Sequence, residues 1–406
     1  SGSEWAWADA DTLTVTGNTI ITGTISAPIN LKIETGARVT WNATTTGTVD
    51  TTVHLITITD DSADDGFFIV DLGSETLSSK GSVLVNKSEV PITVYGGKLE
   101  STETDDNYIT LYSKGDVNID STNGKITISS KAGQAVFVEG ANIEITGNDA
   151  NQLTIKTEAV YFSAVEIAGG GYIAVTGHID EPDKTLIEAR GGNNCGIWNE
   201  DGNITVTHAT VHVVDADSSA IYAKNGDVTV GGKSRIEVSG EKSECVYVEK
   251  GDVSVEGDAE IVADDDNCVG VYSEEGNVTV KGNARIEAGT NGSGGVGVRS
   301  EKGDVNLEDY AELTAVNGGP VVDARGGDIN VGPYVTVYAG SAAGTALRAS
   351  GEIDVDSSNS TITGKQLPDY NYNPASSSGG CNAGFGAIAL IGLGLYRASG
   401  LRRRKA

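Results

Sequence analysis

Four aromatic residues recur at nearly equal spacing in the middle of the chain and are the first candidates for a binding site. Trp198, Tyr222, Tyr247 and Tyr272 follow one another at intervals of 24, 25 and 25 residues. Aromatic faces suit sugar rings, whose C–H surfaces pack on them. If the four side chains stack on one outer face, they form an exposed ladder that binds glycans. Alternatively, the rings only stack on one another and cover a sheet.

Acidic loops are a second candidate site, for calcium, and no other cofactor is expected. Calcium prefers clusters of carboxylate and carbonyl oxygens, which stacked loops can present. None of these loops has the spacing of an EF-hand or of a calcium-binding nonapeptide repeat, so solvated turns are the competing interpretation. The candidate ligands are Asp105, Asp106, Asp215, Asp217, Asp264, Asp265 and Asp266.

Two cysteines are candidates for a disulfide. Cys245 and Cys268 lie in the same loop-to-strand region of adjacent repeats. A disulfide needs Cα atoms about 4.4 to 6.8 Å apart, which neighbouring coils permit but do not guarantee. The competing interpretation is that both are small buried side chains.

Catalysis has little support in the sequence. The chain contains no Gly-x-Ser-x-Gly elbow, no His-Glu-x-x-His motif and no phosphate-binding loop. Many parallel β-helices are polysaccharide lyases or hydrolases that use clustered carboxylates, but acidic residues occur throughout this chain and no pair stands out. We therefore expect no enzymatic activity.

The aromatic spacing belongs to a repeated phrase, Gly-Asp-Val-Thr-Val at residues 226–230. The phrase returns with conservative changes at residues 202–206, 251–255, 276–280, 303–307, 327–331 and 351–355. This period is typical of a solenoid, in which each repeat buries its apolar face only against its neighbours. Period-two alternation within a repeat predicts strands. The sequence therefore predicts an all-β fold, a parallel β-helix with about 24–25 residues and three short strands per coil.

The chain divides into four segments. Residues 1–80 contain strand-like stretches without a clean period and are expected to be irregular coils or a cap. Residues 81–365 hold the repeats. Residues 366–380 are rich in Pro, Ser and Gly and read as a linker. Residues 381–406 combine an apolar run with a basic end, which predicts a C-terminal helix that anchors in a membrane with its basic end on the cytoplasmic side.

The charge balance restricts the class of partner. With 28 Lys and Arg against 57 Asp and Glu, the formal net charge is −29. Such a surface repels phosphate backbones, so we expect no nucleic-acid partner. Glycans, the cell envelope and further copies of this chain remain as expected partners.

The C-terminal tail resembles a known signal. Its Ser-rich linker, Gly379, Gly380 and Cys381, apolar run and terminal arginines resemble the C-terminal sorting signal of exported proteins in the Synergistes group of bacteria. Arg397 interrupts the apolar run and departs from the pattern. The resemblance implies export, cleavage near Gly379, Gly380 or Cys381 by an intramembrane protease of the rhombosortase type, and transfer to the cell surface. Cys381 is then the processing or lipid-attachment residue.

The repeat body is similar, more weakly, to bacterial surface proteins with carbohydrate-binding or adhesin-like β-helices, which share the Gly-Asp-Val-Thr-Val phrase. Our expectation is an exported, non-enzymatic β-helical protein of the bacterial cell surface with a structural or adhesive role. One alternative is a self-assembling extracellular filament subunit that uses the C-terminal helix. The other is a carbohydrate-binding module or a polysaccharide-degrading enzyme.

Overall fold

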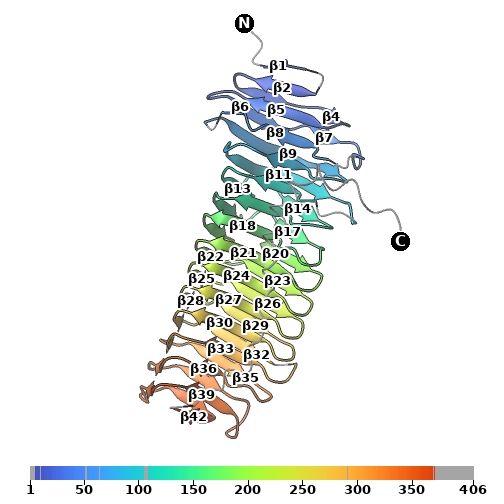
Figure 1. Cartoon of the computed structure of the whole chain (residues 1–406). Helices are drawn as coiled ribbons and strands as arrows, with labels where there is room; N and C mark the ends of the chain where they lie inside the picture. Colours follow the sequence, from blue (N-terminus) through green and yellow to red (C-terminus); the bar gives the residue numbers. More distant parts are fainter. Residues whose placement is uncertain are drawn as a thin grey trace, which may run out of the picture.

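The structure, a computed structural model, is a long stack of β-strand coils that runs from β1 beside the N-terminus to β42 at the other end (Figure 1). It describes residues 5–9, 11–50, 53–63, 65–104, 108–289, 291–368 and 370. About 13 turns with three strands per coil form a parallel β-solenoid, so the predicted fold class is confirmed. The predicted C-terminal apolar helix, residues 381–406, lies outside the described residues.

Sheet 1 is the longest of the three faces of the stack. All its strand pairs are parallel except the first, in which β1 runs antiparallel to β2. Its strands are β1 (Trp5–Trp7), β2 (Thr12–Val15), β5 (Ile29–Ile33), β8 (Ile56–Ile58), β10 (Leu84–Asn86), β12 (Leu111–Ser113), β15 (Val136–Glu139), β18 (Val165–Gly170), β21 (Cys195–Asp201), β24 (Ser219–Asn225), β27 (Glu244–Lys250), β30 (Val269–Glu275), β33 (Val296–Ser300), β36 (Val322–Ala324), β39 (Thr345–Ala349) and β42 (Lys365–Leu367).

Sheets 2 and 3 form the other two faces and share the long strands β9 (Phe67–Ser79) and β11 (Ile92–Ser101), whose halves belong to different sheets. Sheet 2 also contains β3 (Thr19–Ile21), β6 (Arg38–Trp41), β13 (Val117–Asp120), β16 (Ile143–Thr146), β19 (Ile173–Thr176), β22 (Ile204–Thr207), β25 (Val228–Gly231), β28 (Val253–Val255), β31 (Val278–Val280), β34 (Val305–Leu307), β37 (Ile329–Val331) and β40 (Ile353–Val355). Sheet 3 also contains β14 (Ile126–Ser130), β17 (Leu153–Thr157), β20 (Thr185–Arg190), β23 (Thr210–Val214), β26 (Arg235–Ser239), β29 (Glu260–Ala263), β32 (Arg285–Ala288), β35 (Glu312–Ala315), β38 (Thr336–Tyr338) and β41 (Thr361–Thr363).

Only short elements lie outside these three sheets. β4 (Thr24–Ile25) pairs with β7 (Thr44–Thr45), and a 3-10 turn covers Pro182–Lys184. Within the described ranges, no helix is long and apolar enough to cross a membrane.

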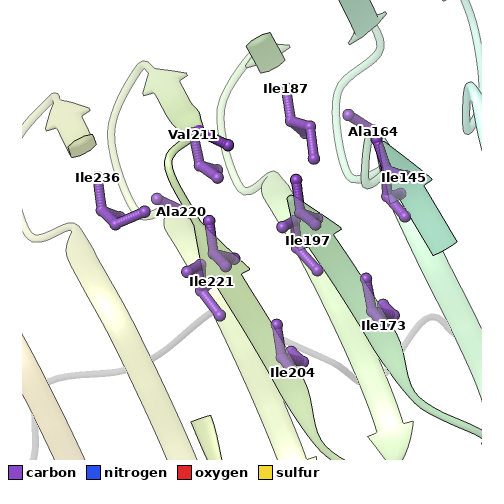
Figure 2. Close-up of a cluster of buried hydrophobic side chains, with 14 of the residues drawn as sticks. Ile145, Ala164, Ile173, Ile187, Ile197, Ile204, Val211, Ala220, Ile221 and Ile236 are labelled. Atoms are coloured by element: carbon purple, nitrogen blue, oxygen red, sulfur yellow. The ribbon is translucent and has the colours of Figure 1, made fainter. Parts of the chain in front are cut away.

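The interior is a set of apolar columns that run along the stack. Val228, Val253 and Val278 stand in register on adjacent coils, and each is at most 1% exposed. Side chains from all three sheets meet in this interior, as Figure 2 shows for Ile204, Ile236 and Ile221. Because each coil places its inward residues directly above those of the previous coil, the period-two alternation of the sequence becomes a continuous core.

The repeated glycine marks the corner between sheets 1 and 2, where successive coils approach closely. Gly251 has a φ of +145°, and a Cβ added to it would lie 2.2 Å from the carbonyl oxygen of Gly226. A side chain is excluded there by both the backbone conformation and the space. The same close approach recurs at Gly226, Gly276 and Gly303, where an added Cβ would lie 2.2, 2.0 and 2.1 Å from the carbonyl oxygen of the preceding corner glycine.

The acidic or amide residue after this glycine joins one coil to the next. The Asp227 Oδ1 accepts a hydrogen bond of 2.9 Å from the backbone N–H of Asp252, and the Asp252 Oδ1 accepts one of 2.8 Å from the N–H of Asn277. The same bond joins Asp304 to Asn277 and Asp328 to Asp304. Each side chain thus satisfies a corner N–H that no strand can reach.

Candidate functional site

The outer face of sheet 1 carries one unbroken column of side chains, which we call the outer column. Its members occupy the same register position on successive strands and point away from the core, since their neighbours Ile197, Ile221, Val246 and Val271 belong to the interior. The outer column consists of Val85, Tyr112, Phe137, Glu166, Trp198, Tyr222, Tyr247, Tyr272, Arg299, Asp323 and Arg348.

The four aromatic residues singled out in the sequence do stack in this column. The ring centroids of Trp198 and Tyr222 are 6.2 Å apart with an interplanar angle of 13°. Those of Tyr222 and Tyr247 are 5.0 Å apart, and those of Tyr247 and Tyr272 are 5.1 Å apart. These are the separations of favourable aromatic pairs. The predicted ladder therefore exists.

The expected exposure of this ladder is wrong. Trp198, Tyr222, Tyr247 and Tyr272 are only 6%, 1%, 5% and 3% exposed, although they face away from the core. The interpretation that the rings cover the sheet thus fits the structure better than an open sugar platform. Sugar binding by these residues stays a prediction, and it requires that this face be uncovered.

Each tyrosine hydroxyl of the outer column donates a hydrogen bond to a glutamate on the next coil. Tyr222 donates to Glu249, Tyr247 donates to Glu274, and Tyr272 donates to Glu301 at 3.3 Å. Burial, and then the hydrogen bond to its glutamate, raises the pKa of Tyr222 and of Tyr247 far above the usual value. The hydroxyls therefore stay protonated donors and fix the ring orientations.

A buried carboxyl interrupts the aromatic part of the outer column. Glu166 lies between Phe137 and Trp198, is 5% exposed, and accepts a hydrogen bond of 3.0 Å from Gln134 Nε2. Burial raises the pKa of Glu166 to about 7, and the charge of Glu200 adds to the rise. The hydrogen bonds from Gln134 and Ser163 act in the opposite direction. This carboxyl is therefore poised to titrate near neutral pH.

An arginine cluster follows the aromatic rings toward the C-terminal end of the outer column. Asp323, with 1% of its side chain exposed, binds Arg348 through both carboxylate oxygens at 2.7 and 2.6 Å. Arg325 Nε donates to Asp323 at 2.9 Å, and Arg299 Nε lies 3.4 Å away. Three guanidinium groups thus surround one buried carboxylate in a protein that is otherwise strongly acidic.

No known relative helps to interpret this face. No family model matches the chain, and no curated protein or solved structure proved similar to it. The function must be argued from the residues themselves.

The predicted calcium ligands are not brought together. Within the described ranges, no group of three or more His, Cys, Asp or Glu side chains could hold a metal ion. Asp215 Oδ2 accepts instead from the backbone N–H of Gly191 at 2.8 Å, and Asp266 Oδ1 accepts from Ser293 Oγ at 3.1 Å. Asp217, Asp264 and Asp265 lie in the same kind of polar corner. Asp105 and Asp106 lie outside the described residues.

The predicted disulfide is not formed. Cys245 and Cys268 are both buried free thiols. The register pairs Glu244 with Val269, so Cys245 stands level with Gly270, and Cys268 precedes the paired segment. Their sulfurs donate to the carbonyls of Val262 and Gly240 at 3.1 and 3.0 Å. The interpretation as small buried side chains is therefore correct.

The predicted processing residues Gly379, Gly380 and Cys381 lie outside the described residues. Of the outer column, only the four aromatic residues from Trp198 to Tyr272 were identified from the sequence; the arginine cluster and the members on β10 to β18 were missed. Tyr112 and Phe137 stack at 5.7 Å, and Glu166 occupies the same column. Tyr112, Phe137 and Glu166 each lie on a strand of sheet 1, but the repeat phrase before residue 202 is too irregular for the sequence to show that these strands are in register.

Replacing Glu166 with Gln should remove a pH dependence of stability. The folded pKa of Glu166 is about 7, against an ordinary value of 4.5 for a glutamate. The contribution of this carboxyl to stability is thus complete below about pH 4.5 and is lost as the pH rises through 7. The loss is about 3 kcal/mol in the wild type, as an order of magnitude. Urea unfolding at pH 4.5 and 8 should show this difference in the wild type and a smaller one in Glu166→Gln. Equal differences in both proteins would show that folding does not raise the pKa of Glu166.

Proposed function

We propose that this chain is an exported bacterial surface protein whose rod acts as a rigid, non-enzymatic stalk or adhesive spacer. The observation that carries the proposal is the unbroken pairing of sheet 1 from β2 to β42, which makes the described chain one stiff body. With about 13 turns, the rod is on the order of 60 Å long. A net charge of −29 keeps such rods soluble and apart from one another.

The position of the tail supports this function. Residues 371–406 follow the last coil, so an anchor in this segment holds the rod by its C-terminal end and directs β1 away from the membrane. The apolar run and the basic residues 402–405 have the order expected of a segment that enters a membrane with its basic end inside. The resemblance of residues 379–387 to a sorting signal agrees with this arrangement.

Cell fractionation tests the proposal. In bacteria that export this protein, the full chain should remain in the cell envelope and be accessible to antibodies on intact cells. A chain that ends at Tyr370 should appear in the medium. Cys381→Ser should lower surface retention if Cys381 is the processed residue, whereas Ser377→Ala in the linker should not. Recovery of the full chain in the cytosol would overturn the proposal.

A further inference from the structure

The aromatic rings of the outer column are more deeply buried than the stacking of their own coils would make them. On the outside of a single sheet, a ring can be covered above and below by the rings of adjacent coils, but its outward edge faces solvent. Tyr222 and Tyr272 are nevertheless only 1% and 3% exposed. By contrast, Tyr310 and Tyr334 stack at 5.1 Å on another part of the surface and remain 60% and 47% exposed. Stacking alone therefore does not bury an outward pair of rings in this protein.

The chain leaves the last coil on this same face. After β42, the backbone N–H of Tyr370 donates to the carbonyl of Ala349 at 2.8 Å. The guanidinium of Arg348, the last charged member of the outer column, lies 4.9 Å from the centroid of the Tyr370 ring. The chain beyond Tyr370 thus starts at the C-terminal end of the outer column.

We propose that the apolar segment at residues 383–396 of this same chain packs on the aromatic part of the outer column. This segment is free of charged residues and contains Phe385, Ile388, Leu390 and Ile391. Covering the rings of Trp198, Tyr222, Tyr247 and Tyr272 with it removes two apolar surfaces from water at once. Gly384, Gly386, Gly392 and Gly394 leave room for close approach to the rings.

The lengths agree with this arrangement. Arg348 and Tyr272 are three strands apart, about 14 Å at the usual spacing of strands. Residues 371–382 span this distance easily, since an extended chain covers about 3.3 Å per residue. The rings from Trp198 to Tyr272 cover about 14 Å. As a helix, residues 383–396 are about 21 Å long, enough to cover all of them.

The charges agree as well. A tail that runs back along the outer column carries Arg402, Arg403, Arg404 and Lys405 beyond Trp198. Glu200 lies on β21 beside Trp198, and the next strands present Glu166 and Glu139 on the outer face; Glu200 and Glu139 are partly exposed. Opposite charges thus meet at the far end of the packed segment. If the tail enters a membrane, it leaves the outer column. This inference rests on the proposed function and gives the tail two alternative locations, in the membrane or on the rod.

Hydroxyl-radical footprinting of the purified chain tests the packing, with oxidation measured at Tyr222 and Tyr247 by mass spectrometry. A chain that ends at Tyr370 should be oxidised severalfold faster at both residues than the full chain. Tyr310 and Tyr334 are internal controls and should not change. Because a truncated chain could misfold, the full-length variant Leu390→Asp/Ile391→Asp provides the second measurement and should show the same rise. Its matched control, Ser377→Asp in the linker, should show none.

Two outcomes would overturn the inference. If Tyr222 and Tyr247 stay protected in both variants, the outer column is closed by its own coils. If their protection in the full chain disappears on dilution, a second copy of the chain covers them. Neither outcome affects the proposed surface role, which depends on where the protein is found in the cell, so failures of the two proposals can be told apart.

Discussion

Replacing Asp323 with Ala lowers the free energy of unfolding of the C-terminal coils by about 3–5 kcal/mol, the usual effect of removing one partner from a buried ion pair. Asp323 is the carboxylate around which Arg299, Arg325 and Arg348 gather, and only 1% of its side chain is exposed. Without it, three guanidinium groups share a poorly solvated site and repel one another. Urea unfolding, together with hydrogen exchange of β36 and β39, measures the loss.

Asp354 provides a matched control for this prediction. It is an exposed aspartate on β40 in the same part of the rod. Asp354→Ala should change stability by no more than about 0.5 kcal/mol. A similar loss in both variants would show that the arginine cluster does not depend on Asp323.

The pH gives an independent check on the Asp323 cluster. Burial by itself raises the pKa of Asp323, but the hydrogen bond from Arg348 and the neighbouring positive charges outweigh it and hold the pKa below 3.8. The stability that this carboxylate contributes is therefore complete above about pH 4 and is lost as the pH falls through the lower, folded pKa. Asp323→Asn should not show this acid-dependent loss.

Replacing Gly251 with Ala is the second large perturbation and should cost on the order of 3 kcal/mol. The φ of +145° is unfavourable for alanine, and the new Cβ would meet the Gly226 carbonyl oxygen at 2.2 Å. Backbone hydrogen bonds fix both corners: Gly226 donates to Lys250 at 2.8 Å, and Gly251 donates to Glu275 at 3.0 Å. The two coils cannot separate without breaking these bonds.

Gly23→Ala separates conformational strain from the clash. Gly23 also has a positive φ, +105°, but no heavy atom lies within 4 Å of its ideal Cβ. This variant should lose only about 1 kcal/mol. Thermal unfolding followed by circular dichroism compares the two. If Gly23→Ala and Gly251→Ala lose equal stability, close approach at the corner is not what requires glycine there.

The repeat could be predicted from the sequence because every coil uses the same local rules. The alternation around Val228 identified a strand, the regular intervals identified the coil, and the register of Val253 and Val278 followed from both. Even the stacking of Trp198 on Tyr222 followed from equal spacing. Strand position, coil length and the register between adjacent coils are all set by the period, so a sequence with a clear period specifies them directly.

Burial on the outer face could not be predicted in the same way. Alternation shows that Tyr222 points outward, but not what lies against it. The neighbours of Glu166 were also hidden, since the intervals from β15 to β21 are longer than in the later coils. The arginine cluster arises from register positions held by aromatic residues in earlier coils. The burial of the rings, the neighbours of Glu166 and the arginine cluster depend on which residue occupies the repeated position in each coil. The period of the repeat does not specify that residue.

The pairing of each strand of sheet 1 with the coil next to it has a consequence for how the chain folds. β1 pairs antiparallel with β2 through Trp5, Ala6 and Trp7, whereas the following strands of sheet 1 pair in parallel from one coil to the next. Every following coil then needs only the coil that has just emerged as its template, because its partners lie about one period back along the chain. Folding can therefore proceed coil by coil in small steps, and each newly formed edge strand is paired by the next segment of the same chain.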